Sequence, residues 1–195
     1  MISASDQPKN YFDRLSEVIN QLDTKKISEL ISKIAFFSKT DKTLFIAGNG
    51  GSAAAASHMS CDLGKTILSG DSASDRYWLR VTSLVDNVPL MTALANDFGY
   101  DKIFSEQLKG LGRQGDMLIV ISASGNSINI LELLKIAKAM GLHTYGLLGF
   151  DGGKAKDLVD DMIIVPSQDY GLVEDAHMIV NHLITDWFRN QNIRQ

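Results

Sequence analysis

The chain has 195 residues, of which 45% are hydrophobic and 22% charged, and its formal net charge at pH 7 is −4. These values are typical of one globular domain, and they exclude a general electrostatic attraction to nucleic acid. With Cys61 as the only cysteine, no apolar run near the ~20 residues of a membrane helix, and no apolar signal core in the first segment, we expect a cytoplasmic protein without membrane partners.

Residues 6–38 are predicted to form two amphipathic helices, with Thr24 as the candidate N-cap of the second. Apolar side chains recur there at helical spacing: Tyr11, Leu15, Val18, Ile19 and Leu22, then Ile27, Leu30, Ile31 and Ile34. The sequence leaves open whether these helices cover the sheet of their own chain or pack against a second chain.

From residue 43 onward, short apolar runs alternate with helical patterns. Strands are expected at 44–47, 80–84, 116–122, 144–148 and 162–165. Helices are expected at 52–68, 88–96, 103–111, 128–140 and 174–189, with a loop at 97–100. This alternation predicts an α/β sandwich with a parallel sheet and right-handed crossovers. Ligands of such folds bind beyond the carboxyl ends of the strands.

The first chemistry-bearing stretch is GNGGSA at 48–53, between an expected strand and an expected helix. Its glycines allow positive φ, and the helix start offers N–H groups to an anion, with Ser52 as a cap or ligand. The stretch also fits the dinucleotide fingerprint G-x-G-x-x-G/A. That fingerprint expects an acidic residue at the end of the next strand, whereas Asp71 and Asp75 lie in a polar stretch. Dinucleotide binding is therefore the weaker interpretation.

The second stretch is SASGNS at 122–127, directly after the apolar run DMLIVIS. Its serine hydroxyls and N–H groups form an anion-binding nest at a helix start. The simpler alternative is a capping turn with Ser127 as the N-cap. Two such loops on neighbouring strands favour a phosphate-binding loop beside a polyol-binding loop.

A metal site is the third candidate. His58 and Asp62 are four residues apart and share one face of the first helix, although an exposed, solvated pair is the alternative. The last helix carries Glu174, His177 and His182, of which Glu174 and His182 are roughly aligned two turns apart. Two imidazoles and two carboxylates suit zinc or a related divalent ion.

Five segments in one order carry a family resemblance: GNGGSA with His58, ANDFGY at 95–100, ISASGNS at 121–127, DGGK at 151–154 and EDAH at 174–177. Over residues 10–190 the chain resembles the phosphoheptose isomerases, also called sedoheptulose-7-phosphate isomerases, of the sugar isomerase (SIS) domain family. The resemblance implies a single SIS domain over 1–195, a flavodoxin-like three-layer α-β-α sandwich with a five-stranded parallel sheet. It also implies a homotetramer with active sites between protomers, for which 6–38 would be oligomerisation helices.

The implied reaction converts sedoheptulose 7-phosphate to D-glycero-D-manno-heptose 7-phosphate, a step towards the heptose of lipopolysaccharide or another surface glycan. We expect it to pass through a cis-enediol, with Asp62 as base, His182 as partner acid and one zinc per site. The implied metal ligands are His58, Asp62, Glu174 and His182. The implied substrate contacts are Asn49, Gly50, Gly51, Ser52, Asp62, Asn96, Asp97, Ser122, Ala123, Ser124, Ser127 and Glu174.

Four positions depart from the family pattern. Asp62 replaces a glutamate that binds metal and acts as base, and Glu174 replaces a metal-binding glutamine. Ala123 replaces a usual threonine, and Ala55 replaces a usual aspartate. The first two changes either compensate for each other or mark a paralogue acting on another phosphosugar.

Two further interpretations stay open. One is a non-catalytic tetramer that binds a replication initiator, like a relative in the same family that lacks the complete metal set; the presence of His58 and His182 argues against it. The other is a regulatory domain that senses a phosphosugar. Such a domain usually comes with a DNA-binding segment, and the two N-terminal helices are too short and too acidic for one.

Overall fold

The computed structural model of the chain describes residues 3–65 and 78–193. Its centre is a five-stranded, fully parallel sheet in the order β2-β1-β3-β4-β5. The strands are β1 (Thr43–Gly48), β2 (Arg80–Ser83), β3 (Met117–Ser122), β4 (His143–Gly149) and β5 (Asp161–Val165). The predicted α/β sandwich with a five-stranded parallel sheet is therefore confirmed.

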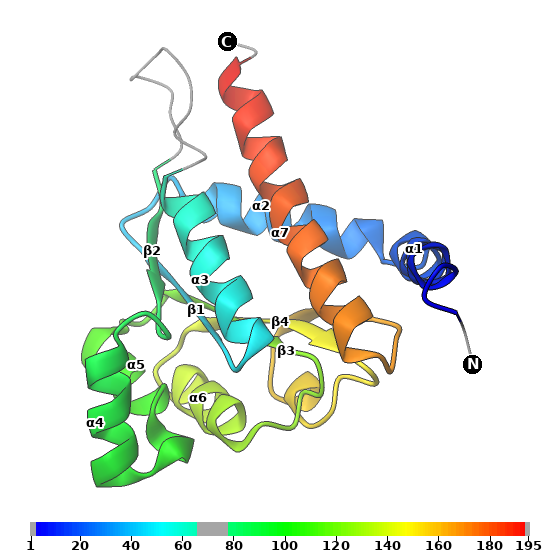
Figure 1. Ribbon diagram of the computed structural model, residues 1–195. Coiled ribbons are helices and arrows are strands. Elements are labelled where there is room, and N and C mark those ends of the chain that lie inside the picture. The colour runs from blue at the N-terminus through cyan, green and yellow to red at the C-terminus, as the bar shows by residue number, and fades with distance from the viewer. Residues whose placement is uncertain (1–2, 66–77, 194–195) are drawn as a thin grey trace.

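Helices cover both faces of the sheet (Figure 1). They are α1 (Gln7–Asn20), α2 (Thr24–Phe37), α3 (Gly51–Gly64), α4 (Val88–Phe98), α5 (Ser105–Leu111), α6 (Ile128–Ala139) and α7 (Tyr170–Ile193), with short 3₁₀ turns η2 (Tyr100–Lys102) and η3 (Ala155–Asp157). Helices α2, α3 and α7 lie on one side, and α4, α5 and α6 lie on the other. This gives the three layers that the alternation of strands and helices predicts.

Strand β3 shows why the sheet lies in the middle. Its run MLIVIS is buried along its whole length, as expected of a parallel strand covered on both faces. Alternate side chains enter different cores, because successive residues of a strand point to opposite faces. Met117 and Ile119 pack with α2, α3 and α7, whereas Leu118 and Val120 pack with α5 and α6.

The N-terminal helices pack on their own chain. Helix α2 buries Leu30 and Ile34 completely in the core that it shares with α3 and α7. Helix α1 lies against the start of α7, where the Tyr11 hydroxyl donates to Asp175 Oδ2 at 2.7 Å. The question that the sequence left open is thus answered for α2, which covers this chain's own sheet.

The N-terminal ends of two helices differ from the predictions. Thr24 is not the N-cap of α2: it is the first helical residue, and Asp23 accepts from the backbone N–H groups of Lys25 and Lys26. Helix α7 begins at Tyr170 instead of residue 174. Asp169 accounts for the extra turn, because its carboxylate accepts from the N–H groups at the start of that helix.

The C-terminal ends also differ. Helix α4 continues to Phe98, so the predicted loop at 97–100 is wrong for its first two residues; Gly99, with φ of 93°, ends the helix. Helix α3 ends at Gly64, and positions 66–68 of the predicted helix lie outside the described residues, as do Asp71 and Asp75. No described helix combines the length and the apolar character needed to cross a membrane.

The topology determines where a ligand can bind. Strands β1 and β3 are neighbours, but the chain leaves β1 through α3 on one face and leaves β3 through α6 on the other. A crevice opens at such a switch point, outside the carboxyl ends of the strands. The loops at 48–53 and 122–127 follow β1 and β3, so both chemistry-bearing stretches meet at this crevice.

Candidate active site

The serine-rich loop lines a cavity of about 160 Å³ at the switch point. Ser122, Ser124 and Ser127 contribute to its wall together with Asn49 and Ser52. Ser127 occupies the N-cap position of α6, yet its hydroxyl makes no capping hydrogen bond. The simpler interpretation of this loop as a capping turn is therefore incomplete. An anion in this cavity would lie at the start of α6, where the helix dipole favours negative charge.

The glycine-rich segment after β4 packs against the serine loop. Gly125 has φ of 62°, and a Cβ there would lie 2.0 Å from the carbonyl oxygen of Gly152, in the loop after β4. Asn126 joins the two loops, because its Oδ1 accepts from the Lys154 N–H. Its Nδ2 donates to Ser124 O within the serine loop. The DGGK segment at 151–154 thus packs closely behind the candidate phosphate loop.

The turn after β1 is tied to two other elements by Asn49. The amides of Asn49 and Asn129 bond each other reciprocally at 2.8 and 2.9 Å, and Asn129 is buried on α6. The Tyr100 hydroxyl also donates to Asn49 Oδ1, at 3.1 Å. Asn49 therefore faces the cavity with its amide oxygen already engaged, which leaves one N–H of its amide for a ligand.

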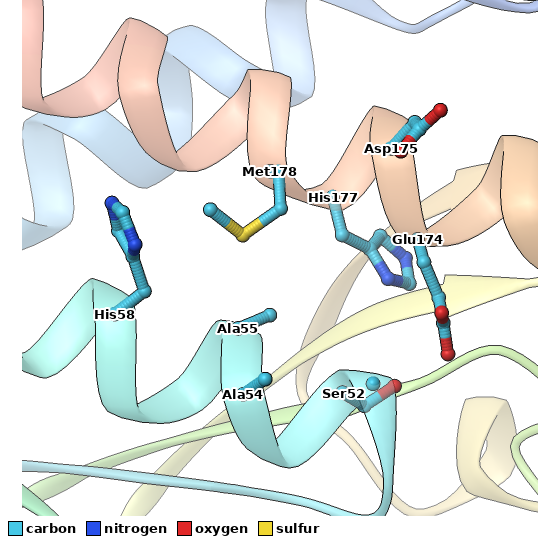
Figure 2. A pocket seen from close by; sticks show the side chains of 9 residues that line it. Ser52, Ala54, Ala55, His58, Glu174, Asp175, His177 and Met178 are labelled. Atoms are coloured by element: carbon cyan, nitrogen blue, oxygen red, sulfur yellow. The ribbon is translucent and has the colours of Figure 1, made fainter.

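Glu174 lies between this cavity and a second one. Its carboxylate contacts the first residue of α3 so closely that a Cβ on Gly51 would lie 2.3 Å from Glu174 Oε2. The second cavity, of about 260 Å³, runs between α3 and α7 (Figure 2) and shares Ser52 and Glu174 with the first. A carboxylate at the start of a helix is stabilised by the dipole, so the negative charge of Glu174 has a local partner in α3.

His177 lies in the wall of the second cavity but is only 1% exposed. Its Nε2 is 3.1 Å from the carbonyl oxygen of Leu148. Since a carbonyl oxygen only accepts, Nε2 carries the proton and Nδ1 is the unprotonated nitrogen. Burial lowers the pKa of His177 from 6.5 to about 4, because the imidazolium would lose its hydration. The side chain is a neutral imidazole near pH 7.

A group of three metal-ligating side chains lies further along the same two helices. The Nε2 atoms of His58 and His182 are 3.1 Å apart, and Asp62 Oδ2 is 3.3 Å from His58 Nε2. One ligand atom from each of the three residues falls within 4.8 Å of the others. His58 and Asp62 lie on α3, whereas His182 lies on α7, which corresponds to the last helix predicted from the sequence.

The geometry of this group fits a shared divalent cation. Ligands about 2.1 Å from a tetrahedral zinc lie roughly 3.4 Å from one another, close to the separations of 3.1 and 3.3 Å found here. The approach of the two Nε2 atoms fits a cation shared by both rings, or one N–H···N hydrogen bond with one ring as the Nε2–H tautomer. Both histidine rings are exposed enough for entry of an ion, whereas the Asp62 side chain is 13% exposed.

Within one chain, Glu174 lies apart from the group formed by His58, Asp62 and His182. Helices α3 and α7 run side by side, and the start of α7 faces the start of α3 (Figure 2). Further along the two helices, His182 faces His58. Eight helical residues rise about 12 Å, which separates Glu174 from His182. The structure therefore assembles three of the four expected ligands, and the ligand role of Glu174 stays a prediction.

The sequence model of the SIS domain matches residues 10–149. The phosphoheptose isomerase of Aliarcobacter butzleri is 38% identical over 164 residues, which cover 84% of this chain and 84% of that protein. The phosphoheptose isomerase of Helicobacter pylori strain P12 is 41% identical over 143 residues, covering 73% of this chain and 72% of that protein. The chain belongs to the phosphoheptose isomerase group of the SIS domain family.

Solved structures extend this relationship beyond residue 149. The phosphoheptose isomerase of Neisseria gonorrhoeae matches 96% of this chain and 100% of its own, with a TM-score of 0.84 and 27% identity. That of Francisella tularensis matches 97% and 100%, with a TM-score of 0.85 and 26% identity. The shared fold of the group thus includes α7, which carries Glu174 and His182.

Within this SIS domain, one predicted pair lies apart from the cavities. Asn96 and Asp97 are exposed in the last turn of α4, where Asn96 Nδ2 donates to Asp97 Oδ1, and neither lines the two cavities described above. Their nearest link to the site is Tyr100, two residues after α4, through its bond to Asn49. Their substrate role stays a prediction.

Sequence reasoning missed Tyr170 as a residue of the site. It lines the serine cavity, is 58% exposed, and packs edge-on against Phe150 with ring centroids 4.9 Å apart. Phe150 is the only non-glycine residue with positive φ in the described chain, so a strained turn presents this aromatic pair. The sequence signal was an aromatic residue at each end of the connection between β4 and α7: Phe150 directly follows β4, and Tyr170 is the first residue of α7.

Proposed function

We propose that this chain is an aldose–ketose isomerase that converts sedoheptulose 7-phosphate to D-glycero-D-manno-heptose 7-phosphate in the cytoplasm, for heptose biosynthesis. The proposal rests on the relatives named phosphoheptose isomerase and on one observation in the site. That observation is the group of His58, Asp62 and His182, assembled from two helices that also line the crevice beside a serine-lined anion cavity.

The phosphate of the substrate would bind in the serine cavity. The hydroxyls of Ser122, Ser124 and Ser127 and the N–H groups at the start of α6 would donate to its oxygens. The close packing of the 151–154 loop against the serine loop would help to hold those donors in place. From there, the sugar chain would extend past Ser52 and Glu174 into the cavity between α3 and α7.

The isomerisation moves one proton between neighbouring carbons and one between their oxygens. Asp62 would take the proton from C1 of the ketose and deliver it to C2, which passes through a cis-enediol. His182 would exchange the hydroxyl protons of the two oxygens. A divalent ion, for which we propose zinc, supplies polarisation of these oxygens when it is bound by His58, Asp62 and His182.

A direct assay tests the proposal. Purified chain would be incubated with sedoheptulose 7-phosphate, with and without zinc, and the aldose product followed by NMR. We expect turnover, loss of turnover with a chelator, and recovery with added zinc. Protein that takes up zinc yet isomerises no heptulose phosphate would refute the substrate assignment and favour another phosphosugar or a non-catalytic role.

We also propose a homotetramer in which exposed apolar side chains, including some from the 6–38 helices, are covered by other protomers. Helix α4 buries none of its residues, and Val88 and Phe98 on it are 60% and 61% exposed. Phe12 and Phe36, on α1 and α2, are 64% and 68% exposed. Assembly over α4 would also bring Asn96 and Asp97 towards a shared site.

Light scattering tests the assembly. We expect a mass of four times 21.4 kDa. A fully active monomer at micromolar concentration would contradict the proposal, because the exposed apolar side chains would then have no partner that covers them.

A further inference from the structure

Asn181 is an unusual residue for its position on α7. It is 2% exposed and lies beside the fully buried, apolar Val180 and Ile184. His177 and Thr185, one turn away on either side, are buried and polar. A buried amide loses hydration, which only complete hydrogen bonding offsets. Here the Oδ1 atom of Asn181 has no hydrogen-bond partner among the described residues. No partner of this oxygen therefore accounts for an asparagine at this buried position.

The amide nitrogen of Asn181 supplies a reason for an asparagine at this position. Asn181 Nδ2 donates to Asp62 Oδ2 at 3.0 Å. The same Asp62 oxygen lies 3.3 Å from His58 Nε2. One carboxylate oxygen is thus held between an amide on α7 and an imidazole on α3. This fixes the direction in which the carboxylate faces the two histidines.

We propose that Asn181 is a positioning residue that orients Asp62 for cation binding and proton transfer. The inference rests on the function proposed above. Groups that hydrogen-bond a metal ligand from behind orient it, and their loss weakens metal affinity or activity about 10- to 100-fold. Orientation matters more for an aspartate than for a glutamate, because the shorter side chain has less reach with which to correct a wrong direction.

The first test compares Asn181→Leu with a matched control on the same helix. Asn190 also donates its amide to a carboxylate, Asp186 Oδ2 at 2.9 Å, but on the exposed side of α7. Zinc affinity would be measured by competition with a chromophoric chelator, together with kcat, KM and the thermal midpoint of the metal-free protein. We expect Asn181→Leu to bind zinc about 10- to 100-fold more weakly, and Asn190→Leu to bind as wild type does.

The kinetic pattern separates positioning from a structural role. Asn181 lines neither of the two cavities described above. The Asn181→Leu change should therefore lower kcat at saturating zinc and leave KM nearly unchanged. The metal-free midpoint should stay close to that of wild type, because leucine replaces an amide with an unpartnered oxygen. If Asn181→Leu does not fold, Asn181→Ala serves instead, since it removes the donated hydrogen bond without adding bulk or charge.

A double-mutant cycle shows whether the effect acts through Asp62. In an Asp62→Ala background, adding Asn181→Leu should change zinc affinity less than twofold. Equal zinc affinity and kcat for wild type and Asn181→Leu would overturn the inference, as would an undiminished effect in the Asp62→Ala background. If the wild-type protein binds no divalent cation, the proposed metal site fails and this inference fails with it. Titration of the wild-type protein alone separates that outcome from a failure of the positioning role only.

Discussion

Replacement of His177 by glutamine tests how a buried imidazole couples stability to pH. The folded chain holds His177 neutral, with burial lowering its pKa to about 4, whereas an unfolded chain binds a proton there below about pH 6.5. The unfolded state therefore binds more protons between these values. The stability from the neutral imidazole is fully present above pH 6.5 and is lost as pH falls towards 4.

The magnitude follows from the two pKa values. Each pKa unit corresponds to about 1.36 kcal/mol, so His177 should remove roughly 3 kcal/mol of unfolding free energy across the whole window. At about pH 5.5 the loss should be near 1.4 kcal/mol. Glutamine can donate to the same carbonyl oxygen of Leu148 but does not titrate, so His177→Gln should lose this part of the pH dependence.

The assay is urea unfolding of metal-free protein at one protein concentration, at several pH values between about 7.5 and 4.5. Other titrating groups contribute equally to both proteins, and the difference between the two curves reports His177. Histidine NMR provides a direct check, because the His177 resonances should not shift between about pH 8 and pH 5.5. Parallel unfolding curves, or a His177 resonance that titrates near 6.5, would refute the reasoning.

Three further predictions concern the site. Ser124→Ala and Ser127→Ala should each raise KM about tenfold or more, since a hydroxyl bonded to phosphate contributes ~1.5–3 kcal/mol; unchanged substrate affinity in both would place the phosphate elsewhere. His182→Asn should abolish most zinc binding and turnover without unfolding the chain. Asp62→Glu should retain or raise turnover if Asp62 is a shortened form of the family base. An inactive Asp62→Glu variant would point to another substrate. Gly125→Ala should cost at least about 2 kcal/mol of stability and raise KM, because the alanine Cβ would lie 2.0 Å from the carbonyl oxygen of Gly152. Calorimetry that shows wild-type stability for this variant would contradict the backing role of the 151–154 loop.

Controls for these variants come from the chain itself. Ser32→Ala removes a serine of α2 whose hydroxyl donates to the carbonyl oxygen of Ser28, one turn earlier, so it should leave KM unchanged. Gly110→Ala adds a Cβ in open space on α5 and should leave stability unchanged or slightly raised. Both controls carry the same chemical change as the test variants at a distance from the site.

Local patterns in the sequence were sufficient for much of this architecture. The continuous apolar run of β3 is typical of a parallel strand buried on both faces, and the apolar spacing of α2 follows the helical period of 3.6 residues. Both patterns depend only on residues that are close in sequence. The order of strands, turns and helices then places GNGGSA and SASGNS at the carboxyl ends of two strands. Their proximity required one more inference, that β1 and β3 are neighbours, and the topology confirms it.

Relations between helices needed the tertiary structure. The spacing of Glu174 and His182 suggested one shared ligand set, but α7 lies alongside α3 so that Glu174 meets the first residue of α3 and His182 meets His58. The pairing of Asn181 with Asp62 joins residues 119 apart. Periodicity can assign each side chain to a face of its own helix, but only the packing of α3 and α7 on the same face of the sheet determines which side chains face one another.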